Sequence, residues 1–402
     1  MLFPPFFLKM RELFFINGKI FSQPITGVQR YAMQILDTLD ALLADGCWVA
    51  NCRFVLLVPS SRMQPLPSYR HIEIREISGS NLHYWEQIRL PWATRGSMLL
   101  NLAGSAPLLK IGQICTFHDT AVFDMPSAYS PAFVRWYRLL FSVQAKLSRR
   151  LFTVSEFSKE RICHHLDVRP EKVKVVYGAA DHMRSQSTDS GALRRLGVEP
   201  KRYFLAVGSA NPTKNFSRLI EAFSGLPDAD ARLVVVGGSN AAVFASSGKM
   251  AQEDPRIIRA GRLTDAELKS LYSHARAYVF PSIYEGFGLP PIEAMLCDCP
   301  VIAARAASIP EICGQAAAYF DPLCVDSMRS VMNRALRDDD WLDGLRGIGR
   351  EHAKKFSWYA SANQLLNELW QLGRVRPGTP EPNSTAKLNF ETVPKLAASD
   401  KC

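Results

Sequence analysis

The chain has 402 residues, of which 47% are hydrophobic and 21% charged, a composition that excludes a disordered protein and leaves room for two domains. The formal net charge is +10, and residues 1–190 hold 22 Lys and Arg against 15 Asp and Glu, a net charge of +7 for that half. A basic half indicates an anionic partner, and without a zinc or RNA-module pattern we do not expect that partner to be nucleic acid.

The nine cysteines are odd in number and mostly lie in apolar runs, which favours buried free thiols in a reducing compartment. Residues 1–7 (MLFPPFF) are apolar but contain two prolines and no charged segment, so neither a signal peptide nor a membrane span is expected there. Translation could begin at Met1 or at Met10. No other stretch approaches a transmembrane length, so we expect a soluble or membrane-peripheral protein.

In chain order, the first half alternates short apolar runs with amphipathic segments, the pattern of strands followed by helices. Strands are predicted at residues 12–17, 52–58, 71–77, 98–101, 114–119, 151–155 and 173–177, and helices at 26–42, 81–91 and 156–166. Residues 131–152 carry aromatic and apolar side chains at helical spacing, interleaved with Arg135, Arg138, Lys146, Arg149 and Arg150. Such a helix suits an interface with anionic lipid, or equally a core helix with a solvated basic face.

Two places in this half are candidate site elements. Thr26 or Gly27 can cap the helix at 26–42 and aim its free N–H groups into a cleft between domains, although an ordinary helix cap explains the same residues. His118 and Asp119 end a strand, and in a parallel sheet such a turn lies at the carboxyl edge that faces a ligand. We favour His118 as a site residue over a pair that only caps the next turn.

The second half has the same alternation. Residues 178–200 are mixed in composition and are predicted to link two domains. Strands are predicted at 203–208, 232–237, 257–261, 275–280 and 299–303, and helices at 215–223, 265–275, 290–294 onward, 327–337, 341–354 and 358–372. The predicted division is a first domain at 11–180, a linker at 181–200, a second domain at 201–357, a final helix at 358–372 and a disordered tail at 373–402.

Two basic residues of this half are candidates for contact with a phosphorylated ligand. Lys214 stands just before a helix, where it can add a point charge to an anion site at the helix end. Arg262 follows a strand and could stack on a base or contact phosphates, although an exposed loop arginine is the alternative. The D-x-D-like runs at 228–230 and 338–340 lie in predicted turns or helix starts, so no metal is expected there.

Residues 280–294 (FPSIYEGFGLPPIEA) carry the most specific pattern of the chain. A buried strand leads into a loop in which Gly286 and Gly288 let the backbone turn and bring its N–H groups close to a ligand. Two carboxylates frame the loop, Glu285 at the strand end and Glu293 in the helix that follows. Strand, loop and helix N-terminus form a common anion site of α/β sheets, and the carboxylates suit a ligand that also carries sugar hydroxyls.

This segment resembles the E-x7-E signature of retaining glycosyltransferases with the GT-B fold, in the large GT4-type family. Glu285 and Glu293 stand at the two Glu positions, with the family's G-F-G-L-P between them. Residues 299–303 and 308–311 resemble the strand and the small-residue loop that follow, and residues 26–32 (TGVQRYA) resemble the glycine loop of bacterial polysaccharide-assembly members. The resemblance covers most of residues 11–372.

The resemblance implies an α/β fold of two Rossmann-like domains that face each other across a cleft, with the final helix crossing back to the first domain. It also implies a role for each candidate residue. Glu293 would hold the ribose hydroxyls, Glu285 the donor sugar at its reacting face, and His118 would orient the sugar or the acceptor. Lys214 would contact the donor diphosphate, but Ser209 and Thr213 replace arginines common in the family, so other groups must share the phosphate charge. These donor-binding groups are expected at Gly27, Arg262, Gly286, Phe287, Gly288 and Leu289.

The resemblance further implies no bound metal or other cofactor and no protein general base, since the leaving phosphate takes that part. Residues 26–32 and 208–215 are most similar to exopolysaccharide and O-antigen enzymes that move mannose from GDP-mannose to a polyprenyl-diphosphate-linked oligosaccharide. The basic first domain agrees with such an anionic acceptor, and predicts a cytoplasmic protein bound to the inner face of the plasma membrane. The alternatives are a UDP-sugar donor, or a membrane-associated scaffold that binds a nucleotide sugar without turnover.

Overall fold

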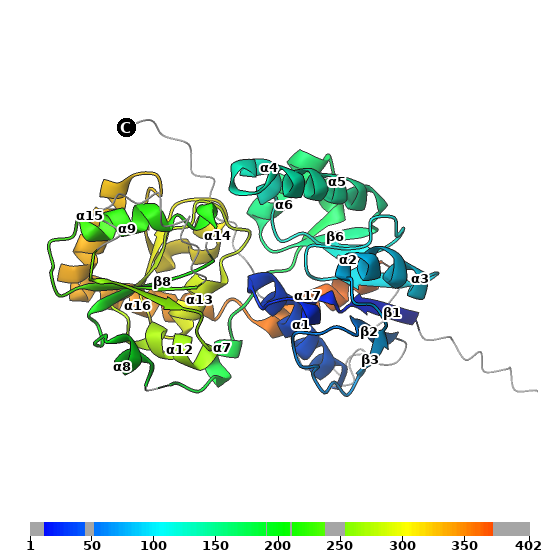
Figure 1. The fold of residues 1–402 in the computed structure, drawn as a ribbon, viewed down its shortest axis with the longest axis horizontal. Coiled ribbons are helices and arrows are strands. Elements are labelled where there is room, and N and C mark those ends of the chain that lie inside the picture. Colours follow the sequence, from blue (N-terminus) through cyan, green and yellow to red (C-terminus); the bar gives the residue numbers. More distant parts are fainter. Residues whose placement is uncertain (1–11, 45–51, 190, 210, 238–253, 373–402) are drawn as a thin grey trace, which may run out of the picture.

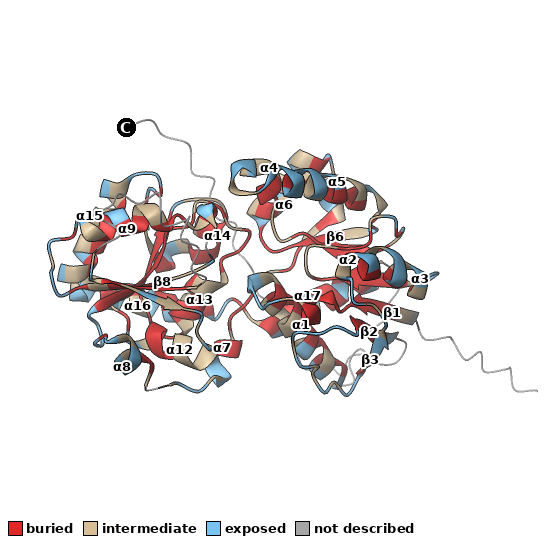
Figure 2. Ribbon diagram, viewed as in Figure 1, coloured by how far each residue is buried: buried red, intermediate tan, exposed pale blue. Residues whose placement is uncertain are grey.

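The computed structural model describes residues 12–44, 52–189, 191–209, 211–237 and 254–372, and in it the chain forms two lobes (Figure 1). Each lobe has a parallel β-sheet, with seven strands in the first domain and six in the second. Buried residues line the sheets and the inner faces of the helices, while exposed residues lie on the outer faces (Figure 2). The predicted α/β architecture of two Rossmann-like domains is confirmed. The apolar N-terminal run, Met10 and the predicted disordered tail lie outside the described residues.

The first sheet has the strand order β3-β2-β1-β4-β5-β6-β7, so the winding reverses between β1 and β4. Ligands of open α/β sheets bind outside the carboxyl ends of the strands at such a reversal. The strands are β1 (Glu12–Asn17), β2 (Cys52–Pro59), β3 (Ile72–Ile77), β4 (Met98–Asn101), β5 (Ile114–Thr116), β6 (Arg150–Thr153) and β7 (Val173–Val175). The helices are α1 (Gly27–Ala44), α2 (Leu82–Tyr84), the π-helical turn η2 (Trp85–Arg89), α3 (Leu90–Ala93), α4 (Ala121–Asp124), α5 (Pro131–Leu147) and α6 (Glu156–Leu166).

The second sheet has the order β10-β9-β8-β11-β12-β13, with its reversal between β8 and β11. The loops that follow these two strands carry Lys214 and Glu285, so the topology places both at the position where a ligand is expected. The strands are β8 (Tyr203–Val207), β9 (Arg232–Val236), β10 (Ile257–Gly261), β11 (Ala277–Phe280), β12 (Val301–Ala304) and β13 (Ala317–Phe320). The helices are α8 (Ala192–Leu196), α9 (Phe216–Ser224), α12 (Asp265–His274), α13 (Leu289–Leu296), α14 (Ile309–Cys313), α15 (Val325–Arg337) and α16 (Asp339–Ala353).

The bounds of several elements differ from the sequence prediction, and two of the differences concern α5 and β13. The helical spacing read over residues 131–152 ends at Leu147, because Ser148 takes an extended conformation and the chain enters β6 at Arg150. Strand β13 was not predicted, since its four residues (AAYF) carry no β-branched residue and their burial does not alternate: the two end residues are buried and the two central ones half-buried.

The final helix, α17 (Trp358–Gln371), lies against the first domain although it follows the second in the sequence (Figure 1). Ser361 donates a hydrogen bond to the carbonyl of Tyr177 (2.7 Å), and Gln364 donates one to the carbonyl of Val175 (2.5 Å). The predicted crossing of this helix to the first domain is confirmed.

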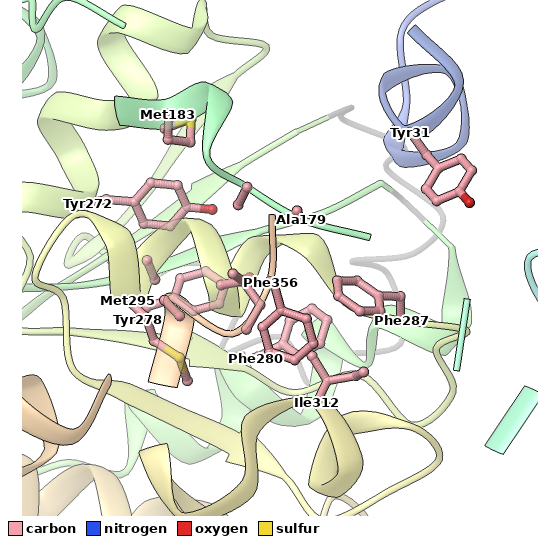
Figure 3. Close-up of a cluster of buried hydrophobic side chains, with 14 of the residues drawn as sticks. Tyr31, Ala179, Met183, Tyr272, Tyr278, Phe280, Phe287, Met295, Ile312 and Phe356 are labelled. Atoms are coloured by element: carbon pink, nitrogen blue, oxygen red, sulfur yellow. The ribbon is translucent and has the colours of Figure 1, made fainter. Parts of the chain in front are cut away.

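The two domains also share an apolar contact. Phe287 of the second domain packs near Tyr177, and edge-on against Phe356, with ring centroids 6.4 Å and 5.6 Å apart. Figure 3 shows Phe287 and Phe356 within a cluster that includes Ile312, with Tyr31 of helix α1 projecting from the other domain. The site described next lies beside this contact.

Candidate active site

Gly286 and Gly288 are needed for different reasons in the loop between β11 and α13. Gly288 has φ +99°, a conformation that residues with a Cβ rarely adopt. Gly286 is needed for space, because a Cβ at this position would lie 2.0 Å from the backbone oxygen of His118 in the first domain. The close approach expected between this loop and a ligand is thus, at Gly286, an approach between the two domains.

Lys214 and Glu285, which are 71 positions apart in the chain, form an ion pair of 2.6 Å between Nζ and Oε1. Their side chains are largely buried, with 23% and 14% exposed. The backbone of the two loops is joined as well, since the N–H of Ile283 donates to the carbonyl of Thr213 (2.8 Å). The structure therefore brings together the predicted diphosphate lysine and the predicted sugar carboxylate.

Glu293 is only 5% exposed, on the first turns of α13. Its Oε2 accepts a hydrogen bond from the hydroxyl of Tyr272 (3.1 Å). The side chain is therefore not a solvated carboxylate at a helix end. A buried charge needs hydrogen-bond donors, and the Tyr272 hydroxyl is one of them.

His118 lies in the loop that follows β5. Its Nε2 is 2.9 Å from the carbonyl of Leu102, and its ring meets Tyr31 edge-on with centroids 5.0 Å apart. Since a carbonyl only accepts, Nε2 carries a proton, which leaves Nδ1 as the acceptor of a neutral ring. Burial lowers the pKa of His118 to about 4, so the ring is neutral at pH 7.

Asp119 does cap the next turn, as the simpler interpretation of the His-Asp pair requires, with its Oδ1 accepting from the N–H of Ala121 (2.9 Å). Burial raises the pKa of Asp119, and the negative charge of Glu285 raises it further. The two loops are thus electrostatically coupled across the domain boundary.

Gly27 is exposed and begins α1, after Thr26, whose carbonyl accepts from the N–H of Arg30 (2.9 Å). The side chain of Gln29 accepts in return from the N–H of Thr26 (3.2 Å), half of a capping box. A Cβ on Gly27 would lie 3.8 Å from the side chain of Leu289, so this helix end faces the start of α13. Arg262 is exposed on the loop after β10.

Four residues near the site were not predicted. Arg30 forms a bidentate ion pair with Asp265 of the second domain, at 2.8 and 2.7 Å. Burial alone would lower the pKa of Arg30, but Asp265 and the nearby charge of Glu293 raise it. Tyr129 of the first domain is hydrogen-bonded to Asn211, within the electrostatic reach of Asp119 and Glu285. Arg30, inside residues 26–32, and Asn211, inside residues 208–215, lie in segments that carry the family resemblance.

A second set of bonds ties the E-x7-E loop to the first domain. The carbonyl of Gly286 accepts from the hydroxyls of Ser155 (2.5 Å) and Ser158 (3.3 Å). The hydroxyl of Tyr284 donates to Asp124 (2.7 Å). Glu311, in the small-residue loop noted above, accepts from the N–H of Glu156 (2.8 Å) and so caps α6 of the other domain.

Comparison with known proteins agrees with this architecture. A model described as glycosyl transferases group 1 matches residues 194–357, and a model described as Glycosyltransferase Family 4 matches residues 89–184. The two matches fall in the second and the first domain. The fold and the loops at its centre thus define a GT-B glycosyltransferase, an enzyme that transfers hexoses. Both domains of the chain thus match glycosyltransferase models, one of them the model of family 4, which confirms the resemblance carried by the E-x7-E segment.

The similar proteins whose names state an activity include mannosyltransferases. O-antigen chain mannosyltransferase B of Escherichia coli is 29% identical over 263 residues, which are 63% of this chain and 69% of that protein. The serotype-specific mannosyltransferase WbdA of Escherichia coli is 28% identical over 272 residues, 64% of this chain, but the match spans only 32% of that protein. O-antigen chain mannosyltransferase RfbU of Salmonella typhimurium is 31% identical over 217 residues, 54% of this chain and 58% of the relative.

Solved structures share the fold. Sucrose-phosphate synthase from Thermosynechococcus elongatus superposes with a TM-score of 0.70 at 19% identity, covering 90% of this chain and 99% of that one. WaaG, a glycosyltransferase involved in lipopolysaccharide biosynthesis, superposes with a TM-score of 0.68 at 16% identity, covering 89% and 99%. At such identities the likeness concerns the fold alone.

Proposed function

We propose that the protein transfers mannose from GDP-mannose to a polyprenyl-diphosphate-linked oligosaccharide in surface polysaccharide synthesis, with retention of the anomeric configuration. The observation that carries this proposal is the Lys214–Glu285 pair of 2.6 Å beside the N-terminus of α13, in a chain whose named relatives include O-antigen mannosyltransferases. The pair offers a cation for a diphosphate and a carboxylate for sugar hydroxyls at one point.

The departing diphosphate carries most of the charge that develops in the reaction, so the site must supply donors aimed at it. In our proposal Lys214 contributes the point charge, since an ammonium has three donors and can hold Glu285 and a phosphate oxygen together. The N–H groups of the loop from Gly286 to Leu289 and the α1 end at Gly27 complete the cradle. Arg262 contacts the base or the phosphates from the loop after β10.

The sugar and the nucleoside are held by the remaining groups. Glu293 accepts hydrogen bonds from the ribose hydroxyls, and Glu285 contacts the sugar at its reacting face. His118, neutral at pH 7 because burial lowers its pKa to about 4, orients the sugar or the acceptor through Nδ1. The bond from the anomeric carbon to the phosphate oxygen breaks, the acceptor oxygen bonds to the same face, and the acceptor proton passes to the leaving phosphate. We propose that no metal takes part, because Lys214 and the loop amides supply the stabilising charge.

Donor turnover tests this proposal. The purified protein is incubated with GDP-mannose, UDP-glucose, UDP-galactose or UDP-N-acetylglucosamine and with polyprenyl-diphosphate oligosaccharides, with and without EDTA, and nucleotide release and label in lipid are followed. We expect release from GDP-mannose only, dependent on the lipid acceptor and unchanged by EDTA, and loss of turnover in Glu285→Ala. Release from a UDP-sugar would correct the donor. Nucleotide binding without any release, unaltered by Glu285→Ala, would support the scaffold, and loss of turnover in EDTA would overturn the metal-free step.

We also propose that the first domain rests on an anionic membrane surface, where a polyprenyl-linked acceptor is held. In the described residues no helix is long and apolar enough to cross a bilayer. Helix α5 has apolar side chains on a buried face and on an exposed face. Leu140 and Phe141 are buried in the core, while Phe133, Trp136 and Leu139 are 39%, 37% and 51% exposed.

A second group of exposed apolar side chains comes from η2, α3 and the loop between β4 and β5, and we call it the Trp92 patch: Ile88, Trp92, Leu109 and Ile111, which are 54%, 72%, 80% and 78% exposed. Its loop is bonded to α5, since the N–H of Gly112 donates to the carbonyl of Leu147 (3.0 Å). Arg89 and Arg95, which are close to Ile88 and Trp92 in the sequence, are exposed as well. Exposed apolar side chains together with cations match a surface of anionic headgroups.

The Trp92 patch gives a direct prediction. Trp92→Glu is expected to weaken binding to vesicles of phosphatidylglycerol and phosphatidylethanolamine by roughly tenfold, because it removes an apolar side chain that would insert into the membrane interface and adds repulsion from the anionic headgroups. Vesicle co-sedimentation measures this, and raised salt should weaken the wild-type binding. Leu323→Glu, at a residue 64% exposed in the second domain, is the matched control and should bind normally. Equal binding by Trp92→Glu and wild type would refute the membrane surface proposed here.

A further inference from the structure

His182 belongs to the linker and is buried against α13, the helix that carries Glu293. The proposed reaction does not use it. It begins α7 (His182–Ser185), directly after the first domain, and is 9% exposed. Its Nε2 lies 3.6 Å from Oε1 of Glu293, and that nitrogen has no hydrogen-bond partner. Helices α7 and α13 are in contact, and Figure 3 shows Met183 of α7 in the same apolar cluster as Tyr272.

The other ring nitrogen determines where the proton is. The indole N–H of Trp358 donates to Nδ1 of His182, with 3.4 Å between the nitrogens. An indole nitrogen is only a donor, so Nδ1 must be an acceptor without a proton. A neutral His182 ring therefore carries its proton on Nε2, on the side of Glu293.

Glu293 therefore faces a polar group at each of its oxygens. Tyr272 donates a hydrogen bond to Oε2 at 3.1 Å, and the Nε2–H of His182 faces Oε1 at 3.6 Å, an electrostatic contact that is longer than a hydrogen bond. A carboxylate has about four acceptor directions, so these two neighbours favour one rotation of the side chain and leave other directions for ligand hydroxyls. The two partners come from different segments, one from α12 and one from the linker.

We propose that His182 is a positioning residue for the donor nucleoside: it holds Glu293 in the orientation in which this carboxylate accepts the ribose 2′- and 3′-hydroxyls. The inference rests on the proposed function, in which Glu293 binds the ribose. Asp181, its neighbour, accepts from the N–H of Trp358 (3.1 Å) and caps α17. In this segment Asp181 therefore has a structural role, whereas the ring of His182 acts on the donor site.

The test uses discrimination between ribose and its deoxy analogues. Dissociation constants are measured by calorimetry for GDP and 2′,3′-dideoxy-GDP, and for the UDP pair if UDP binds more tightly. Wild type is expected to prefer the ribonucleotide, and His182→Ala to lose about tenfold of that preference, the size of one hydrogen bond to a charged group. His182→Gln, whose amide can accept from Trp358 and donate to Glu293, should restore most of the preference. Trp358→Phe, which frees the tautomer, should give an intermediate value.

His274→Ala is the control, because this exposed residue's ring bonds only to the carbonyl of Ser270 one turn earlier (2.8 Å) among the contacts that the structure describes for it. It should leave the preference unchanged. If His182→Ala weakened both nucleotides equally, or His182→Gln behaved like His182→Ala, the positioning role would be overturned while the assignment of Glu293 stood. If wild type and Glu293→Gln both failed to discriminate, the assignment of Glu293, and with it this inference, would fall.

Discussion

Lys214→Met is expected to lower kcat by roughly two to three orders of magnitude, the effect of removing one preorganised donor from a developing oxyanion. The proposed role of this lysine is to stabilise the leaving diphosphate, whose charge grows as the glycosidic bond breaks. Its Nζ is fixed for that role by Glu285 at 2.6 Å, so little reorganisation accompanies the reaction. Initial rates of nucleotide release, measured over a range of GDP-mannose concentrations, separate kcat from KM.

The same substitution leaves Glu285 without its cation, so a double variant is needed. Lys214→Met with Glu285→Gln should be little slower than Lys214→Met alone, because two residues that act as a unit are strongly non-additive. Lys354→Met is the control, since Lys354 forms a comparable 2.7 Å pair with Glu351 on an exposed surface. A Lys214→Met enzyme with wild-type kcat would contradict the proposed role of the lysine.

The second large effect is expected at Gly286. Gly286→Ala places a methyl group 2.0 Å from the carbonyl oxygen of His118, so the two domains must separate by roughly 1 Å. A misplacement of this size costs about 100-fold in rate when groups of both domains act together. We expect kcat/KM to fall by about that factor while GDP, held by the second domain, still binds. Small-angle scattering and fluorescence titration provide the measurements.

Gly347→Ala is the matched control for this substitution. Gly347 lies in α16, where a Cβ would meet no atom within 4 Å, so alanine should stabilise the helix by about 0.5–1 kcal/mol and leave the rate unchanged. Thermal unfolding of the two variants measures the difference. Wild-type kcat/KM in Gly286→Ala would show that the contact with His118 is not required for turnover.

The sequence predicts the elements of the site better than their contacts. The buried strands, the glycine loop and the helix at Glu293 follow from local patterns, because apolar periodicity and helix-end residues act over a few positions. The approach of Lys214 to Glu285 was implied by the resemblance and has no local signal. It arises because β8 and β11 are neighbours at the point where the winding of the sheet reverses.

The bonds between the domains could not be predicted in this way. Arg30 and Glu311 lie in segments that resemble the family, but nothing in the sequence indicates their partners, and Ser155 has the pattern of an ordinary helix cap. Only the packing of the two domains pairs Arg30 with Asp265, Ser155 with Gly286 and Glu311 with α6. Likewise, Gly286 was interpreted as giving room to a ligand, and the structure shows that it gives room to the backbone of the other domain. Such contacts depend on the relative placement of two folded bodies, which local patterns do not encode.

The crossing of α17 has a consequence for how the protein is made on the ribosome. Buried leucines of this helix, among them Leu365 and Leu369, complete the core beside α1 and β7, yet they are synthesised after the whole second domain. At ordinary translation rates, roughly ten to forty seconds separate Val175 from Trp358. During that interval an apolar face of the first domain is uncovered. We therefore expect chaperones to bind the nascent chain until its last helix emerges.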